Sequence, residues 1–267
     1  MLDLESLAQQ VVSIAKETGD FLRRERVDFR LSKVEKKSQG NYVSYVDETA
    51  EKKLVDLLGQ LLPEAGFIAE EGTASYDEEY LCWVIDPLDG TTNYIHDEAP
   101  YGVSIALKKE GEVVLGVVYE VCRDECFVAW KGGGAYLNGH PIRVSELDAL
   151  RDAFLIVELP YDAEKYKKTG LHLIDKLYGK VGGIRMNGSA AVGICYVALG
   201  RLDVWLEAFI AEWDFAAAAL IVKEAGGMVT DFYGNSSYQE GHHLVVTNGK
   251  LHCALLSLVQ ECLPEGM

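Results

Sequence analysis

The sequence predicts an α/β protein in which an antiparallel meander is followed by a layered half of alternating strands and helices. In the first half, short turns join successive strands, and strands joined in this way must run antiparallel. After about Ser145 the strand and helix patterns alternate, which is typical of layered α/β folds. This change predicts two subdomains, residues 1–145 and 146–267. The chain of 267 residues is long enough to bury a large core.

Two helices and two strands are expected before the meander. Apolar residues recur at helical spacing over residues 4–15, and Asp47 can cap a second helix that stops before Pro63. Residues 67–69 predict a short strand, and residues 81–85 predict a longer, buried strand. Both strands end directly before acidic residues.

The remaining elements follow from apolar runs that are separated by turn residues. Meander strands are expected over residues 103–107, 112–121 and 125–130, and a further strand is expected over 142–144 after the turn at Asn138 and Gly139. In the second half, strands are expected over 153–157, 184–186, 203–206, 228–231 and 244–247, and helices over 166–178, 190–199, 214–225 and 251–262.

The composition is that of a globular protein with an acidic balance. Hydrophobic residues make up 49% of the chain and charged residues 25%. The net charge of −17 argues against a general nucleic-acid binder, which needs a basic face. The six cysteines show neither zinc-site spacing nor a need for disulfides. There is no secretory apolar region and no run long enough to span a membrane, so a cytoplasmic protein without membrane contact is expected.

The most informative run is WVIDPLDGTTNY, residues 83–94. A strand leads into Asp86 and Asp89, which are separated by a rigid proline and a leucine. Gly90 permits backbone conformations that other residues resist, so the two carboxylates and the Leu88 carbonyl can converge on hard cations. If Gly90 opens a helix, the N–H groups there are available to a phosphate. This layout predicts a metal-dependent phosphatase.

Two further acidic motifs strengthen this interpretation. Glu70 opens the motif Glu-Glu-Gly at the end of the short strand, and Asp214 follows a tryptophan where a helix should begin. Each has an ordinary alternative, because Asp-Gly pairs mark turns and Asp214 can serve as a helix N-cap. Together with Asp86 and Asp89, they supply four carboxylates at element ends. Such oxygen ligands suit Mg²⁺.

These motifs resemble those of the inositol monophosphatase family. The resemblance covers nearly the whole chain, because weaker features also match: Asp47, the glycine-rich run 132–139, the run Gly188-Ser189-Ala190-Ala191, and Glu207. It implies the inositol monophosphatase or sugar phosphatase fold, a layered αβαβα sandwich. It also implies a metal site at the junction of the two halves.

The resemblance implies two or three Mg²⁺ ions in the active site. Glu70, Asp86 and the Leu88 carbonyl are expected to hold one ion. Asp86, Asp89 and Asp214 are expected to hold a second, and a third is expected to share Glu70. Mn²⁺ is expected to substitute for Mg²⁺, and Li⁺ and Ca²⁺ are expected to inhibit.

The resemblance also assigns roles in catalysis and substrate binding. The catalytic residues are expected to be Glu70, Thr91 and Asp47, with Thr91 hydrogen-bonded to Asp47 and orienting the attacking water. The N–H groups of Gly90 and Thr91 are expected to contact the phosphoryl oxygens. The substrate alcohol is expected to contact Gly188, Ser189, Ala190, Glu207 and Asp214.

The expected reaction is magnesium-dependent hydrolysis of a phosphate monoester, inositol 1-phosphate first, by a metal-activated water without a covalent intermediate. Fructose-1,6-bisphosphatase, histidinol-phosphatase and nucleotide 3′-phosphatase activities are the alternatives within the superfamily. A haloacid-dehalogenase-like phosphatase is disfavoured, because its paired aspartates are one residue closer and lie near the chain start. An interaction protein that partners the transcription machinery is the alternative from another class. The resemblance further implies a homodimer.

Overall fold

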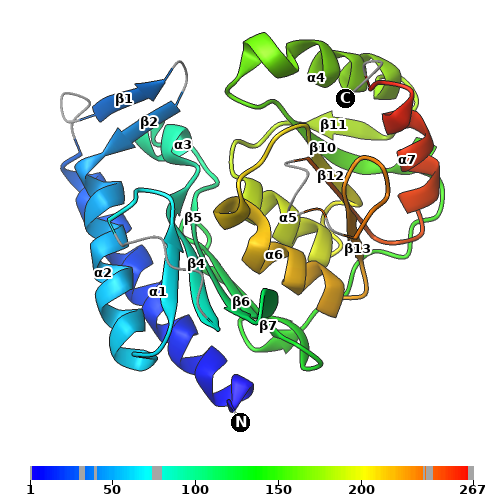
Figure 1. The fold of residues 1–267 in the computed structure, drawn as a ribbon. Helices are drawn as coiled ribbons and strands as arrows, with labels where there is room; N and C mark the ends of the chain where they lie inside the picture. Colours follow the sequence, from blue (N-terminus) through cyan, green and yellow to red (C-terminus); the bar gives the residue numbers. More distant parts are fainter. Residues whose placement is uncertain are drawn as a thin grey trace.

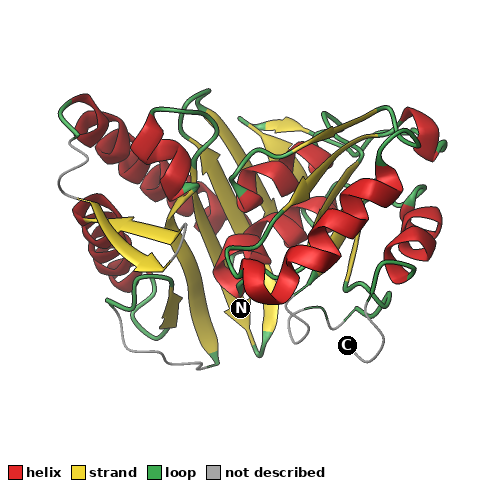
Figure 2. Ribbon diagram, turned by 90° about the horizontal axis from the view of Figure 1, so that it is seen from above, coloured by secondary structure: helices red, strands yellow, loops and turns green. Residues whose placement is uncertain are grey.

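The computed structural model describes residues 2–29, 34–38, 41–73, 80–236, 238 and 243–263, and its elements form five layers (Figure 1). The first layer is α1 (Leu4–Val27) and α2 (Tyr45–Leu61), which cover one face of a seven-stranded sheet. Next, α5 (Ala190–Ala198) and α6 (Glu212–Glu224) lie between this sheet and a five-stranded sheet. Helices α4 (Ala163–Leu177) and α7 (His252–Gln260) cover the outer face (Figure 2). The expected αβαβα sandwich is confirmed.

The seven-stranded sheet contains the predicted meander. Its strands, in spatial order, are β3 (Gly66–Ala69), β4 (Leu81–Asp89), β5 (Gly102–Lys109), β6 (Glu112–Glu120), β7 (Glu125–Trp130), β8 (Gly134–Leu137) and β9 (His140–Pro141). Only the β3–β4 pair among these strands is parallel.

The strand predicted over residues 142–144 is wrong. Asn138 and Gly139 do form a hairpin, with φ angles of 48° and 81°, but this hairpin joins β8 to β9. Strand β9 ends at Pro141, and after it, among the described residues, only the N–H of Ile142 still donates to β8, to the Ala135 carbonyl at 2.9 Å.

The five-stranded sheet is mixed. Its spatial order is β11 (Gly183–Arg185), β10 (Phe154–Glu158), β12 (Val204–Glu207), β14 (Leu244–Thr247) and β13 (Met228–Thr230). Strand β10 runs parallel to both of its neighbours, so β10 and β12 end at the same edge of the sheet. The hairpin of β1 (Val34–Ser38) and β2 (Asn41–Ser44) was not predicted.

The central helices lack the polar face of a surface helix because sheets cover them on both sides. Helix α6 carries four consecutive buried alanines, residues 216–219. These small side chains let α6 approach the seven-stranded sheet closely. A Cβ atom added at Gly116 of β6 would lie 2.6 Å from the backbone oxygen of Ala217.

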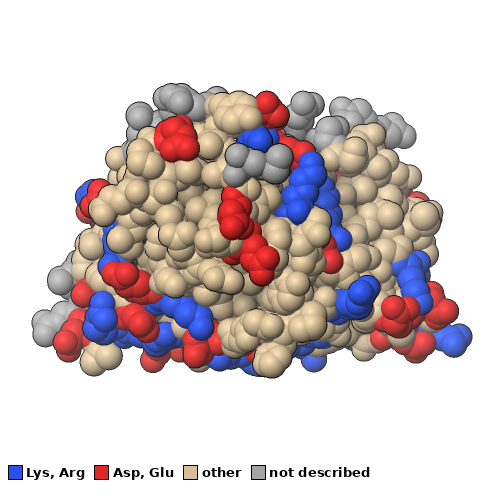
Figure 3. All heavy atoms as spheres, turned by 90° about the horizontal axis from the view of Figure 1, so that it is seen from below, with Lys and Arg blue, Asp and Glu red and all other residues tan. Residues whose placement is uncertain are grey.

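Two surface and helix properties of the described residues relate to the composition. None of the described helices is both long and apolar enough to cross a membrane. On the face seen in Figure 3, the described Lys and Arg side chains are interspersed with Asp and Glu.

Candidate active site

The first acidic motif lies on a bulge in β4. Asp86 pairs with Ser104 of β5, and Asp89 pairs with Gly102 of β5. Two residues of β4 therefore lie opposite one residue of β5 between these pairs. Pro87 cannot donate to the ladder, which favours the irregularity at this point. Within the bulge, the N–H of Leu88 donates to Asp86 Oδ1 at 2.9 Å. Strand β4 therefore continues beyond the predicted 81–85 segment and carries both aspartates.

Three carboxylates from separate elements meet beside this bulge. They belong to Glu70, which follows β3, to Asp86 on β4 and to Asp214 in the first turn of α6. One carboxylate oxygen of each residue lies within 4.8 Å of those of the other two. Burial raises the pKa of Asp86 well above its ordinary value, and the neighbouring Glu70, Asp89 and Asp214 raise it further. The group is therefore unfavourable as three bare anions, and either a bound proton or a bound cation relieves the repulsion.

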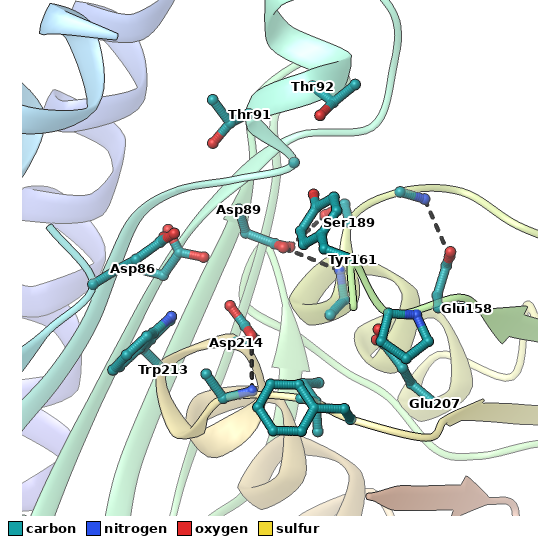
Figure 4. A pocket seen from close by; sticks show the side chains of 18 of the residues that line it. Asp86, Asp89, Thr91, Thr92, Glu158, Tyr161, Ser189, Glu207, Trp213 and Asp214 are labelled. Carbon is teal, nitrogen blue, oxygen red and sulfur yellow. Dashed lines mark hydrogen bonds between the residues drawn. The ribbon is translucent and has the colours of Figure 1, made fainter. Parts of the chain in front are cut away.

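A cavity of about 530 Å³ opens from this group (Figure 4). Its acidic lining residues are Glu70, Asp86, Asp89, Glu158, Asp162, Glu207 and Asp214. Among the described residues that line it, none is Lys, Arg or His. An all-oxygen donor set fits Mg²⁺, so the residues present fit the expected metal.

Asp214 is held by the start of α6. Its Oδ2 accepts from the N–H of Ala211 at 3.1 Å, so it caps the helix from inside the first turn and not from the N-cap position. Strand β5 supports the same turn, because the Ser104 hydroxyl donates to the Trp213 carbonyl at 3.2 Å. The Lys108 ammonium lies 2.9 Å from a carboxylate oxygen of Glu212.

Asp89 lies next to this group but its carboxylate is directed to the start of α5. Oδ1 accepts from the N–H of Ala190 at 3.0 Å, and Oδ2 accepts from the N–H of Ala191 at 2.9 Å and from the Ser189 hydroxyl. Burial raises the pKa of Asp89 to about 7 against the lowering effect of these donors. The structure thus brings Ser189 and Ala190 to the cavity through Asp89.

Thr91 is the first residue of α3 (Thr91–His96), which Gly90 precedes with a φ of 91°. The Thr91 hydroxyl lies 3.0 Å from Asp47 Oδ1 and 3.1 Å from the Leu88 carbonyl oxygen. Asp47 Oδ2 accepts from the N–H and the hydroxyl of Ser44. Burial raises the pKa of Asp47, although the Ser44 and Thr91 hydrogen bonds lower it. The predicted Thr91–Asp47 hydrogen bond is present.

The model of the inositol monophosphatase family matches residues 3–263. The chain belongs to this family. The Nus factor SuhB of Pseudomonas aeruginosa is 39% identical over 261 residues, covering 95% of each chain. The inositol-1-monophosphatase of Mesorhizobium japonicum is 34% identical over 257 residues, covering 96% of this chain and 97% of the relative.

Solved structures agree with this assignment. The extragenic suppressor protein suhB from Bartonella henselae superposes with a TM-score of 0.91 at 33% identity, covering 98% of this chain and all of that chain. An IMPase from Thermotoga maritima superposes with a TM-score of 0.86 at 33% identity, covering 94% of this chain and 96% of that chain. Family membership and these structures identify the protein as a phosphatase of the inositol monophosphatase type.

Glu207 lies on the cavity wall opposite the motif of β4, and a second carboxylate lies beside it. Glu158 and Glu207 are register partners at the ends of the parallel strands β10 and β12. Glu158 Oε1 accepts from the N–H groups of Asn187 at 2.7 Å and Gly188 at 3.1 Å. Burial and the neighbouring Glu158 carboxylate raise the pKa of Glu207 well above its ordinary value.

Sequence reasoning missed Glu158, Tyr161 and Asn93. Glu158 directly follows the strand predicted over residues 153–157, and this position at a strand end was the available signal, whereas Glu207 was singled out by the family resemblance. Tyr161 lines the cavity near Thr92 and had no recognisable pattern around it. Asn93 joins the halves of the molecule, because its side-chain nitrogen donates to the carbonyls of Pro100 at 2.8 Å and Asn187 at 2.7 Å.

Proposed function

We propose that the protein hydrolyses the phosphate monoester of a small polyol in a Mg²⁺-dependent reaction, with inositol 1-phosphate as substrate. The observation that carries this proposal is the meeting of the Glu70, Asp86 and Asp214 carboxylates, with one oxygen of each within 4.8 Å of the others, beside the cavity. These carboxylates would hold divalent cations, which would reverse the local charge that a phosphate meets.

The proposed metal ligands are those expected from the sequence. Glu70, Asp86 and the Leu88 carbonyl would hold one Mg²⁺, and Asp86, Asp89 and Asp214 would hold a second. A third ion would share Glu70. Bound ions would supply a water of lowered pKa and positive charge for the phosphoryl oxygens. Mn²⁺ is proposed as a substitute, and Li⁺ and Ca²⁺ as inhibitors.

Thr91 and Asp47 would handle the proton of the attacking water. The Thr91 hydroxyl hydrogen points to Asp47 or to the Leu88 carbonyl, which leaves lone pairs of Oγ1 to accept a hydrogen bond from water. As the water attacks, its proton would pass to Thr91 Oγ1 and the hydroxyl proton of Thr91 would pass to Asp47. The raised pKa of Asp47 makes it a better proton acceptor. The displacement is direct, without a covalent intermediate.

Two carboxylates favour monophosphates over bisphosphates. Glu158 and Glu207 face the part of the cavity that the alcohol would occupy, and carboxylate oxygens accept hydrogen bonds from hydroxyl groups. A second phosphate in this place would lie beside two carboxyl groups and no cation among the described lining residues, and it would disfavour their ionised forms further. We therefore place fructose 1,6-bisphosphate and adenosine 3′,5′-bisphosphate behind inositol 1-phosphate. Histidinol phosphate stays the nearer alternative, since its cationic groups suit these carboxylates.

Phosphate release from a substrate panel tests the proposal. The panel is inositol 1-phosphate, histidinol phosphate, fructose 1,6-bisphosphate and adenosine 3′,5′-bisphosphate, each with Mg²⁺ and with EDTA. We expect the highest kcat/KM for inositol 1-phosphate and no release in EDTA. A higher kcat/KM for either bisphosphate would contradict the assigned role of Glu158 and Glu207.

A regulatory role is a second candidate, because relatives with the name Nus factor are up to 39% identical to the chain. We propose that the protein contacts the transcription machinery independently of hydrolysis. Asp86→Asn should abolish hydrolysis and spare a transcriptional phenotype. If the phenotype is lost together with hydrolysis, this role is contradicted.

We propose that the active site is shared by two subdomains, residues 1–145 and 146–267, and that the protein is a homodimer as its family implies. The two sheets support the division, since β9 ends at Pro141 and β10 begins at Phe154. Light scattering on the purified protein tests the homodimer.

A further inference from the structure

Helix α2 directs two buried carboxylates to the active site. Asp47 and Glu51 are one helical turn apart and are 1% and 0% exposed. Asp47 binds the hydroxyl of Thr91, whereas Glu51 binds the loop that follows β3. Most other buried positions of α2 are apolar, so these two acidic side chains stand out on its inner face.

Both carboxylate oxygens of Glu51 are used by one short loop. Oε2 accepts from the N–H of Glu71 at 2.7 Å. Oε1 accepts from the N–H and from the hydroxyl of Thr73, each at 2.7 Å. Gly72, between the two donors, has a φ of 67°, which lets successive N–H groups turn to the same anion.

A carboxylate without solvent contact is costly unless it is hydrogen-bonded. Three donors from the loop supply this compensation for Glu51. The loop therefore cannot turn away from α2 without leaving a buried charge unsatisfied. This cost gives the loop one preferred position against the helix.

We propose that Glu51 is a positioning residue that fixes the direction of Glu70 and thereby sets the Mg²⁺ affinity of the site. The N–H of Glu71 lies in the same peptide plane as the Glu70 carbonyl and Cα. On the other side, the N–H of Glu70 donates to the Ile85 carbonyl at 3.4 Å. With both flanking peptide planes held, the Glu70 side chain leaves the backbone toward Asp86. The inference rests on the proposed metal site.

Glu51→Gln tests this role with almost no change in shape. An amide NH₂ cannot accept a hydrogen bond, so either the N–H of Glu71 or that of Thr73 loses its partner. We expect the dissociation constant for Mn²⁺, measured by isothermal titration calorimetry, to rise about tenfold or more, as for other residues that orient a metal ligand. The Mg²⁺ concentration for half-maximal phosphate release should rise by a similar factor, while kcat at saturating Mg²⁺ changes little.

Glu224→Gln is the matched control. Glu224 also accepts from two backbone N–H groups of a neighbouring turn, those of Gly132 at 2.8 Å and Gly134 at 2.9 Å. It lies at the opposite end of α6 from Asp214. Glu224→Gln should bind Mn²⁺ with the wild-type constant, because the turn that it holds carries no proposed ligand.

Thr73→Val removes one of the three donors and leaves the Glu51 carboxylate in place. It should also weaken Mn²⁺ binding, but by a smaller factor than Glu51→Gln. If circular dichroism shows that Glu51→Gln does not fold, Thr73→Val becomes the deciding variant. The inference would be overturned if folded Glu51→Gln bound Mn²⁺ with the wild-type affinity. If Glu51→Gln does not fold, the same result for Thr73→Val would overturn it. A wild-type protein that binds Mn²⁺ without hydrolysing any phosphate ester would overturn the proposed function alone.

Discussion

The hydroxyl of Thr91 lies 3.0 Å from Oδ1 of Asp47, across 44 positions of sequence. This contact joins the start of α3 to the first turn of α2. Asp47 also caps its own helix through Ser44, so its carboxylate is held from two sides. Asp47, the proposed proton acceptor, and Thr91, which is proposed to orient the water, are therefore fixed relative to one another by these hydrogen bonds.

Thr91→Val should lower kcat for inositol 1-phosphate by about 100-fold or more, the usual contribution of a positioned proton acceptor. Valine keeps the branched shape of threonine and removes only the hydroxyl. The Mn²⁺ dissociation constant should stay close to the wild-type value. Thr91→Ser is the control, since it retains the hydroxyl and should keep most of the activity. Equal losses in both variants would show that packing at this position matters and the hydroxyl does not.

Metal removal should abolish hydrolysis and lower the thermal midpoint. Ions that bind only the folded state stabilise it by mass action, so Mg²⁺ should raise the midpoint in a concentration-dependent manner. Asp86→Asn should lose both the activity and most of this stabilisation, because Asp86 belongs to the three-carboxylate group. Differential scanning calorimetry across a Mg²⁺ series measures the shift. Full phosphate release in excess EDTA would refute the metal requirement.

Most helices and strands were predictable because they have strong local signals, whereas their αβαβα layering was expected from the family resemblance. Short turns defined the meander, and strand–helix alternation defined the second half. The β1–β2 hairpin escaped prediction, since its strand residues include lysines, serine and glutamate and lack an apolar alternation. The strand expected over residues 142–144 failed for another reason. An apolar run alone cannot show where a neighbouring strand stops.

The site was predictable where one motif carries several functional groups, as in the run from Asp86 to Thr91. Contacts between distant segments were expected only where the family resemblance implied them, as for Thr91 and Asp47. The cap that Asp89 provides for α5 depends on the packing of two helices and a sheet. Glu51 likewise sits in an ordinary amphipathic pattern, and only the structure brings it to the Glu70 loop.

The metal-free protein should become less stable as the pH rises from about 5 to about 8. Burial raises the pKa of Asp89 from 3.8 to about 7 and raises that of Asp86 as well. A carboxyl whose pKa is raised on folding stabilises the fold while it is protonated, and this stability is lost as the pH passes the folded-state pKa.

Mg²⁺ should remove most of this pH dependence, because it binds the ionised carboxylates. Thermal midpoints measured from pH 5 to pH 8, with EDTA and with Mg²⁺, check both statements. A midpoint that rises with pH in EDTA would contradict the assignment of these buried carboxyls.

Glu207→Gln should weaken the discrimination against bisphosphates. The change removes one of the two carboxylates that face the alcohol side of the cavity and keeps a hydrogen-bonding side chain. The ratio of kcat/KM for inositol 1-phosphate to that for fructose 1,6-bisphosphate should fall by about tenfold, which corresponds to about 1.4 kcal/mol of lost discrimination. Glu164→Gln, on an exposed position of α4, serves as the control. An unchanged ratio would mean that Glu207 does not face the leaving alcohol.

Two glycine substitutions test the close packing that brings α6, and with it Asp214, to the seven-stranded sheet. Gly116→Ala should lower the free energy of unfolding by about 1–3 kcal/mol, because the new methyl would lie 2.6 Å from the Ala217 backbone oxygen. Gly59→Ala should raise it by about 0.5–1 kcal/mol, since alanine favours helix and a methyl at this position of α2 would meet open space. Urea denaturation measures both.

Because the sheet and α6 must separate to admit the methyl at Gly116, the Gly116→Ala variant should also bind Mn²⁺ more weakly, whereas Gly59→Ala should bind it normally. Equal stabilities for the two variants would contradict the tight contact between β6 and α6.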